Sequence, residues 1–439
     1  MKFMKFGKAL LMSALSLGVV FSVSSCVRSY TVGFLYVTGT VTAQPSGDGI
    51  ITGFKIDHNT GRLAAIDGLP VSSGGANPVR AVLLLGSKFL YVLNRGVNST
   101  GGSECTTADP CQNSNIVEFA VGGNGILTEQ QTFSTQGINP FRMIADASGS
   151  YLYVLEHDAP SSAACALALG ASASSCGDIT AFSINQTTGR LETIVNAQVT
   201  AANGTPIPYF PVPANPIDFA ETAGFFLTLS GTPATGDSVF PYGLSAGNGQ
   251  LTVSQNSSQP VGALAGTAIV NAGGYVYILD DEAPAAPNTT GATSQILPFT
   301  VGTNGALQAE TGGIVADDPG LSNPIFLLVE SKGKFLYVAN QGNNTNTTDP
   351  QSGLTGYVID PSTHQLSFIA GEPFGSGAGP QCIVEDPSDQ YIYLADLYDS
   401  SVSGRVVDPN SGVLNNLRAN TSYALEGPAT WCLMDGRTD

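Results

Sequence analysis

Residues 334–342 of the chain read KFLYVANQG, and residues 88–96 read almost the same, KFLYVLNRG. Phe, Tyr and Val favour a half-buried β-strand, so each copy predicts a strand. Related sequence motifs occur at seven places, which indicates that the same strand is repeated along the whole chain. The copies are residues 34–37, 89–92, 151–154, 226–229, 275–278, 335–338 and 391–394.

A second motif follows each copy, as in IDHNTGRL (56–63) and INQTTGRL (184–191). Asn, Thr or Ser before Gly, set between apolar residues, predicts a tight turn between two strands. The centre of this turn recurs at steps of 48 to 64 residues. It lies at residues 61, 125, 189, 249, 305, 364 and 412, of which all but His364 are Gly.

A third motif, Asn-Pro or Gly-Pro before an apolar run, precedes five of the copies, at residues 77, 139, 215, 323 and 379. One repeat therefore has four strands: A after the Pro, B the quoted phrase, C before the Gly turn and D after it. Such units at 40 to 65 residues are typical of propeller blades. The first repeat lacks strand A, and residues 427–435 offer a spare one. We predict an all-β, seven-bladed β-propeller, a single domain over residues 26–439, whose ring the C-terminal strand closes by completing blade 1.

The N-terminus predicts an exported lipoprotein. Lys2, Lys5 and Lys8 precede a short apolar run that ends in Val-Ser-Ser-Cys26, the pattern of a signal peptide (residues 1–25) cut before a lipid-bearing Cys. The alternative is an ordinary secretory signal with a chance Cys. We expect a lipoprotein of the cell envelope, facing the periplasm or the surface and held in the outer membrane only through the lipid on Cys26.

The charge of the chain limits its partners. Three of the 16 basic residues and none of the 34 acidic ones lie in residues 1–25, so the remainder carries 13 bases against 34 acids, a formal charge of −21. This balance argues against nucleic acid, whose phosphates require basic patches. We expect a monomer, without cofactor or metal, whose partner is a small-molecule lactone or an envelope protein or glycan.

Six cysteines follow Cys26. Cys105 and Cys111, and Cys165 and Cys176, each lie close together in a polar stretch, and in an oxidising compartment they predict two loop disulfides. The strands of Cys382 and Cys432 would be neighbours across the ring closure. Aligned from the Pro the two side chains point the same way, and aligned from the following Asp they face each other, so a disulfide and two buried thiols both stay open.

Candidate site residues gather where strand A starts and strand B ends, because these ends share one mouth of the channel. Arg80 and Arg142 hold the same position in neighbouring blades, and an Arg fork suits a carboxylate or phosphate. Glu156 or His157 could act as a general base. The alternative is a structural network in which these groups pair with one another. The expected substrate-binding residues are Arg80, Arg142, Asp218, Asn94, Gln381 and Asp396.

The repeated motifs, P-x-x-x-x-x-D-x-x-G-x-F-L-Y-V-x-N and I-D-x-x-T-G-x-L, resemble those of the lactonase family of seven-bladed propellers. The match covers residues 30–435 and is best at DPSDQYIYLADL (386–397). Gln381 and Tyr398 stand where family enzymes tend to carry His and Gly. The resemblance implies the propeller fold and a lactonase activity like that of 6-phosphogluconolactonases, on an acidic sugar lactone or related ester. The alternative is a non-catalytic scaffold that binds an envelope protein or glycan.

Overall fold

The computed structural model describes residues 30–41, 47–84, 86, 88–222, 224–253, 257–272, 274–281, 294–310, 312–342, 352–418 and 420–436. Residues 31–439 form one compact unit. Cys26 lies outside the described residues. Within them, no helix combines the length and the apolar character that a membrane span requires.

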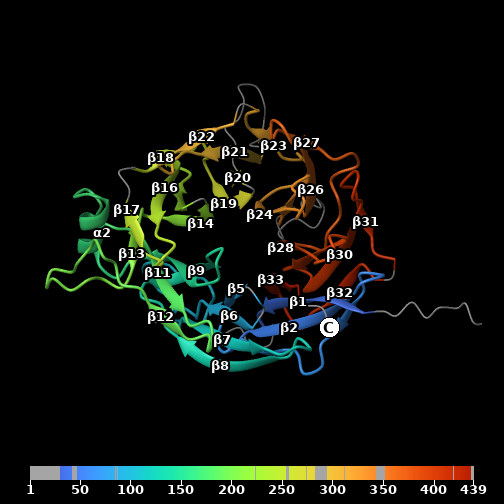
Figure 1. Ribbon diagram of the computed structural model, residues 1–439, viewed down its shortest axis with the longest axis horizontal. Coiled ribbons are helices and arrows are strands. Elements are labelled where there is room, and N and C mark those ends of the chain that lie inside the picture. Colours follow the sequence, from blue (N-terminus) through green and yellow to red (C-terminus); the bar gives the residue numbers. More distant parts are fainter. Residues whose placement is uncertain are drawn as a thin grey trace, which may run out of the picture. The chain divides into compact units, whose positions relative to one another are not determined.

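Seven antiparallel sheets stand around a central opening, so the predicted seven-bladed propeller is confirmed (Figure 1). In each blade the strands follow one another from the channel outward, and most blades add a short strand that also pairs with strand C. Blade 1 consists of β33 (Ala429–Asp435), β1 (Thr31–Gly39), β2 (Ile50–Asp57), β3 (Leu63–Ala65) and β4 (Val71–Ser72). Blade 2 consists of β5 (Pro78–Leu83), β6 (Phe89–Asn94), β7 (Asn115–Val121) and β8 (Leu127–Phe133). Blade 3 consists of β9 (Ile138–Ala145), β10 (Tyr151–Asp158), β11 (Gly177–Ile184), β12 (Leu191–Thr193) and β13 (Phe210–Val212).

The other four blades repeat this order around the ring. Blade 4 consists of β14 (Pro216–Thr222), β15 (Phe225–Thr232), β16 (Gly236–Leu244), β17 (Leu251–Val253) and β18 (Gln259–Pro260). Blade 5 consists of β19 (Gly266–Ala272), β20 (Tyr275–Asp280), β21 (Gln295–Val301), β22 (Leu307–Ala309) and β23 (Val315–Ala316). Blade 6 consists of β24 (Pro324–Val329), β25 (Phe335–Asn340), β26 (Gly353–Ile359) and β27 (Leu366–Phe368). Blade 7 consists of β28 (Pro380–Glu385), β29 (Tyr391–Asp396), β30 (Ser401–Val407), β31 (Leu414–Asn416) and β32 (Ser422–Ala424).

The C-terminal strand closes the ring as expected, because β33 pairs with β1 from Phe34↔Asp435 to Gly39↔Ala429. Next to this closure Cys382 of β28 and Cys432 of β33 form a disulfide, with Cα atoms 6.0 Å apart. Of the two alignments, the one made from the following Asp therefore holds. The alignment from the Pro fails because Ala429, and not Pro428, holds the position in blade 1 that Pro78 holds in blade 2. Pro428 therefore precedes the equivalent position by one residue.

Two details of the repeat differ from the sequence prediction. In blade 4 the phrase starts at Phe225 rather than Phe226, since Phe225 packs on Gly305 of blade 5 as Phe34 packs on Gly125 of blade 2. In blade 5 the inner strand β19 begins at Gly266 without an Asn-Pro signal, so the sequence motif did not identify it.

The hydrophobic core is divided among the junctions between blades. Seven clusters of buried side chains each join two neighbouring blades, the one between blades 7 and 1 included. Burial of apolar surface is therefore possible only when both neighbours are present, as in other repeat proteins.

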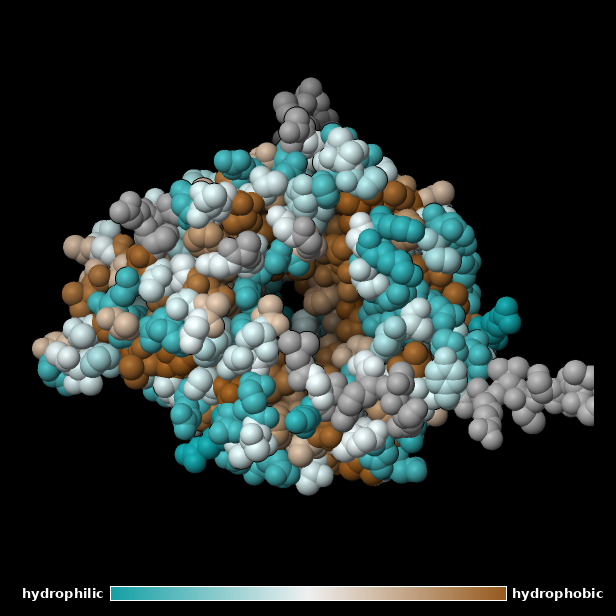
Figure 2. Space-filling view, in the orientation of Figure 1, coloured by the Kyte–Doolittle hydropathy of each residue, from teal (hydrophilic) through white to brown (hydrophobic). Residues whose placement is uncertain are grey.

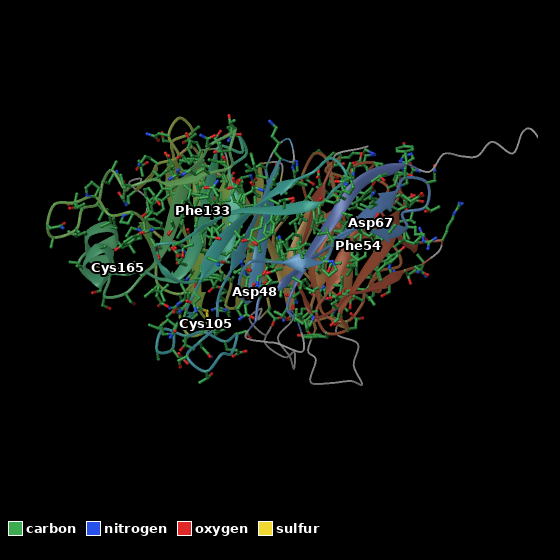
Figure 3. All side chains as sticks on the ribbon, turned by 90° about the horizontal axis from the view of Figure 1, so that it is seen from below. Asp48, Phe54, Asp67, Cys105, Phe133 and Cys165 are labelled. Carbon is green, nitrogen blue, oxygen red and sulfur yellow. A yellow bond between two sulfur atoms is a disulfide. The ribbon has the colours of Figure 1, made fainter. Side chains whose placement is uncertain are left out.

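Two disulfide-bearing loops extend from blades 2 and 3. Cys105 bonds to Cys111 in the loop between β6 and β7, and Cys165 bonds to Cys176 in the loop between β10 and β11. The second loop contains α2 (Ser162–Leu169). Figure 3 places Cys105 toward one side of the ring, where β6 ends, and Phe133, at the end of β8, nearer the other.

Candidate functional site

The inner strand of every blade has a bulge where it reaches the channel mouth. In all seven blades the pairing of strands A and B skips one residue at this point. A bulge bends the strand and re-aims the side chains beside it. The residue after the bulge is Arg80, Arg142, Asp218, Ala268, Phe326, Cys382 and Trp431 in blades 2 to 7 and 1.

Six of these seven residues line a cavity of about 490 Å³ inside the channel. The exception is Cys382, which is fully buried in its disulfide. We call the six the inner belt: Arg80, Arg142, Asp218, Ala268, Phe326 and Trp431. Figure 2 shows the opening at the centre of the ring.

A second cavity, of about 400 Å³, lies at the channel mouth. We call it the mouth pocket, and it shares Arg80 and Arg142 with the inner belt. The rest of its lining comes from two sets of residues. One set is the residues that the pairing of strand A skips, and the other is the residues that follow Asn94, Glu156 and Asp396 on strand B. These are Val79, Phe141, Gln381, Thr430, Arg95, His157 and Leu397. None of the described residues that line the mouth pocket is acidic.

Arg80 is held by an aromatic ring rather than by a carboxylate. Its guanidinium carbon lies 3.9 Å from the centre of the Trp431 ring, and its Nη1 donates to the Val79 carbonyl at 2.7 Å. The Trp431 Nε1 in turn donates to the Ala81 carbonyl at 3.1 Å, so the indole is fixed on the strand that carries Arg80. A cation over an indole face is an attractive contact that leaves most guanidinium N–H groups for a ligand.

Arg142 has one carboxylate partner. Its Nε donates to Asp218 Oδ1 at 3.1 Å, and its Nη1 donates to the Phe141 carbonyl at 3.4 Å. The second oxygen of Asp218 accepts from the Ile269 amide at 3.1 Å, which fixes that carboxylate on blade 5. The sequence also allowed a structural network in which the charged groups at the mouth pair with one another. The ion pair between Arg142 and Asp218 is one such contact. It engages one edge of Arg142 and leaves Nη2 outside the pair.

Three guanidinium groups converge on the mouth pocket, because Arg95 lies there beside the other two. Burial lowers the pKa of Arg80 and of Arg95, and the charge of Arg142 lowers both further. Asp218 opposes the pKa shift at Arg80, and Glu104 opposes it at Arg95. An anion placed among these three groups would relieve their mutual repulsion.

His157 lies at the same pocket with a carboxylate behind it. Its Nδ1 lies 3.1 Å from Asp158 Oδ2, and 38% of its side chain is exposed. Asp158 also accepts hydrogen bonds from Asn139 Nδ2 at 3.1 Å and from Thr107 at 2.9 Å. The Nδ1 atom makes no hydrogen bond with the described residues, so Asp158 lies beside the imidazole without fixing its orientation, and His157 lines the pocket as a candidate base.

Three predicted site residues do not line either cavity. Glu156, Asn94 and Asp396 each pair with the Pro of strand A in their blades and are fully buried inside the sheet. Glu156 accepts from the Gly137 amide at 2.9 Å and from Thr180 at 2.5 Å. Burial raises the pKa of Glu156 and that of its cross-strand partner Asp178. These side chains tie loops to the strand rather than face a ligand.

Asn94 and Asp396 have the same kind of surroundings. Asn94 Nδ2 donates to the Ser73 carbonyl and to Asn115, both at 2.9 Å. Asp396 accepts from Ser401 at 3.4 Å. The other predicted residues lie where expected: Arg80, Arg142, Gln381 and His157 at the mouth pocket, and Asp218 in the inner belt.

Sequence reasoning gave no site role to Trp431 or Phe326. It placed both Asn94 and Arg95 at the mouth end of strand B and chose Asn94 as the binding residue, whereas Arg95 is the one that lines the mouth pocket. Trp431 was placed on the closing strand, but its equivalence to Arg80 depends on the one-residue offset of Pro428. The signal that could have found it is the Asp that ends the strand, Asp435, which aligns with Asp386 of blade 7. Among the described residues no group of three or more His, Cys, Asp or Glu could hold a metal ion.

Comparisons with known proteins agree with this architecture. The family model described as "Lactonase, 7-bladed beta-propeller" matches residues 48–206 and 321–431, more than half of the chain. No curated protein matches it. Among solved structures, a candidate 6-phosphogluconolactonase of Bacteroides fragilis is similar with a TM-score of 0.63 and 16% identity, over 92% of this chain and 98% of that one. The periplasmic gluconolactonase of Pseudomonas aeruginosa is similar with a TM-score of 0.63 and 15% identity, over 92% and 99%. Identities this low carry the fold alone.

Proposed function

Since the chain belongs to the lactonase family of seven-bladed β-propellers, we propose that it hydrolyses an acidic sugar lactone or a related ester at the mouth of its channel. The observation that carries the proposal is the convergence of Arg80, Arg95 and Arg142 on a pocket whose described lining has no acidic residue. This cluster stands in a chain whose formal net charge is −18. Bidentate guanidinium groups are the usual protein partners of carboxylate and phosphate.

The proposed chemistry is the addition of water to the lactone carbonyl. Arg80 and Arg142 hold the carboxylate or phosphate of the substrate, which places the ring in the mouth pocket. His157, which lies beside Asp158, takes a proton from the attacking water, and the new C–O bond turns the carbonyl oxygen into an oxyanion. When the tetrahedral intermediate collapses, the bond to the ring oxygen breaks. His157 returns the proton to that oxygen, and the product is the open hydroxy acid.

Arg95 is the group that we assign to the oxyanion. Its Nη2 donates to the Cys105 carbonyl at 3.4 Å, and its buried Nε has no hydrogen-bond partner among the described residues. A donor fixed in this way lowers the energy of the charge that develops in the transition state. The disulfide between Cys105 and Cys111 stabilises the loop to which Arg95 is bonded.

We also propose that the propeller is anchored in the cell envelope through a lipid on Cys26, which agrees with its disulfides, since these persist in oxidising compartments. The description of the Pseudomonas aeruginosa neighbour as periplasmic supports the same type of location.

A second candidate is a propeller that binds the same anion, or an acidic envelope glycan, without catalysis. The observation in its favour is the burial of Glu156, which leaves His157 as the single predicted base at the mouth pocket. The two candidates share the Arg cluster and differ in turnover, so one set of variants separates them.

Anion binding can be followed through Trp431, because it is the only tryptophan of the chain and lies against Arg80. We expect 6-phosphogluconate and gluconate to change its fluorescence. Arg80→Gln/Arg142→Gln should weaken this binding more than tenfold, about 1.4 kcal/mol or more. The exposed pair Arg62→Gln/Arg190→Gln removes the same charge and should leave binding unchanged. A double variant that binds like the wild type would contradict the anion site.

Turnover is measured on 6-phosphogluconolactone, with neutral glucono-δ-lactone as the reference. His157→Gln should abolish hydrolysis while 6-phosphogluconate still binds. Binding without hydrolysis in the wild type would leave the scaffold candidate in place of the enzyme.

A further inference from the structure

A tyrosine on strand B joins each of five blades to the next one. The hydroxyl groups of Tyr36, Tyr153, Tyr337 and Tyr393 donate at 2.7–3.0 Å to the carbonyl of the turn Gly between strands C and D of the following blade, and Tyr91 makes the same contact with Gly189. Two residues earlier on strand B, an aromatic ring packs where a Cβ on that Gly would clash. These contacts close the junction on the side opposite the mouth pocket. Blade 4 differs because Leu227 stands in place of the Tyr.

The junction between blades 5 and 6 has the Tyr but lacks the Gly. His364 occupies the turn, with φ at 56°, and its ring stacks on Tyr275 with centroids 3.8 Å apart. Tyr277 is only 2% exposed and lines the cavity at this junction. Burial raises the pKa of Tyr277 to about 12, so this hydroxyl is a neutral donor.

Where five other junctions have the Tyr–Gly hydrogen bond, this one contains a cavity of about 530 Å³. We call it the side pocket. Tyr275, Tyr277 and His364 line it, with aliphatic walls from Val270, Leu327 and Ile359. Its volume is in the range of small-molecule sites. The side pocket adjoins the cavity of the inner belt, because Val270, Asn271 and Leu327 line both.

The side pocket offers no free charge among its described lining residues. Its one carboxylate, Glu330, is 5% exposed and accepts from the amides of Lys332 at 2.9 Å, Lys334 at 2.5 Å and Phe335 at 3.3 Å. A buried group satisfied in this way gains little from a ligand cation. An anion would find no guanidinium or ammonium group in this lining. Asn271 and Ser331 also line it, but Asn271 Nδ2 donates to the Glu221 carbonyl at 2.8 Å and Ser331 Oγ donates to Asp389 at 2.7 Å. The other polar side chains of the lining are Tyr275, Tyr277 and His364.

We propose that the side pocket binds a neutral sugar ring. The aliphatic and aromatic walls match the apolar C–H faces of a pyranose, while Tyr277 and His364 exchange hydrogen bonds with its hydroxyl groups. Because Tyr277 and His364 bring polar atoms to an otherwise largely apolar wall, a hydroxyl-bearing ligand is favoured over an apolar one. The site is separate from the anion-binding mouth pocket and does not depend on the proposed hydrolysis.

The test is saturation-transfer NMR on the full chain with glucose, galactose and maltose as probes. At least one of these sugars should bind the wild type. Tyr277→Phe removes only the hydroxyl and should weaken binding at least tenfold. His364→Gly restores the residue of the other six turns, which should let Tyr277 bond to the turn carbonyl and close the pocket, so binding should be lost.

Tyr337→Phe is the matched control, because Tyr337 holds the same position in blade 6 and donates to Gly412 at 2.8 Å. It should lower the melting temperature and leave sugar binding unchanged. Tyr277→Phe should leave the melting temperature unchanged. The Arg80→Gln/Arg142→Gln variant should also keep its sugar signal. No signal with any of the three sugars, a signal that survives in both Tyr277→Phe and His364→Gly, or one lost only in the Arg variant would overturn the side-pocket site.

Discussion

At the scale of single residues, alternation along strand B separates structural groups from functional ones. The residue that pairs with the Pro of strand A points into the blade, as Glu156 and Asp396 do, and the next residue, His157 or Leu397, lines the mouth pocket. Successive side chains of a strand lie on opposite sides, so a shift of one residue exchanges a buried acid for an accessible base. Polar character alone does not distinguish the two positions.

The buried end of strand B also makes a prediction about pH. Burial is the main cause that raises the pKa of Asp396 to about 8; the charge of Asp399 contributes to this shift, and hydrogen bonds from Ser403 and Ser401 oppose it. An acid whose pKa is higher in the folded state favours folding at low pH, and this stability is lost as pH rises from about 4 towards 8, by at most about 1.4 kcal/mol per pH unit. In urea titrations, the free energy of unfolding of Asp396→Asn should therefore differ less between pH 5 and pH 8 than that of the wild type.

Asn fits this position, since Asn94 and Asn340 hold it in blades 2 and 6. Glu192→Gln, a change of the same charge at an exposed site, serves as the control and should keep the pH dependence of the wild type. If Asp396→Asn also keeps that dependence, Asp396 is ionised in the folded protein across this range.

At the scale of elements, β33 performs two tasks. It supplies the inner strand of blade 1, and it carries Trp431 to the inner belt, where the ring contacts Arg80 and packs against Phe326 at 5.3 Å. Closing the ring and building the candidate site therefore depend on the same seven residues.

Removal of residues 427–439 tests the closing strand. The truncated chain loses the partner of β1, leaves strand edges exposed at the closure and frees Cys382. We expect loss of cooperative unfolding or aggregation, because the free energy lost is several kcal/mol of the roughly 5–15 kcal/mol that stabilise a domain. Calorimetry that shows the wild-type transition in the truncated chain would contradict this role.

The disulfide of the closure has its own control. Cys382→Ser/Cys432→Ser keeps β33 in place and removes a crosslink over 50 residues, so it should cost about 3–4 kcal/mol in the free energy of unfolding. Cys165→Ser/Cys176→Ser removes a crosslink over 11 residues and should cost less. Both variants should still unfold cooperatively, unlike the truncated chain.

At the scale of the whole molecule, an acidic propeller concentrates three of its nine arginines at one mouth. Negative charge over the remaining surface repels anions, whereas the Arg cluster attracts them, so an anionic ligand is directed to the channel. Each junction contributes its own hydrophobic cluster, which holds the mouth rigid while the loops above it differ from blade to blade.

A substitution of Cys26 tests whether the protein is anchored in a membrane. If a lipid on Cys26 anchors the chain, Cys26→Ser should move the protein from the membrane fraction to the periplasm or medium. Ser24→Ala, a substitution within the same motif, should leave the protein with the membranes. Unchanged fractionation of Cys26→Ser would contradict lipid anchoring.

The fold could be predicted from the amino-acid sequence alone, because the strand and turn residues recur from blade to blade and local preferences add up over seven copies. The sequence also determined the closing strand and the two Arg positions, which depend on counting from the Pro of strand A. The tertiary structure was needed where counting residues from the Pro of strand A does not give the correct position. The bulges set which side chains reach the cavity, and the offset of Pro428 brings Cys432 to Cys382 and Trp431 to Arg80. His364 was visible as the exception among seven turns, but its effect depends on the neighbouring blade, since a residue in a propeller acts across a junction between segments far apart in the chain.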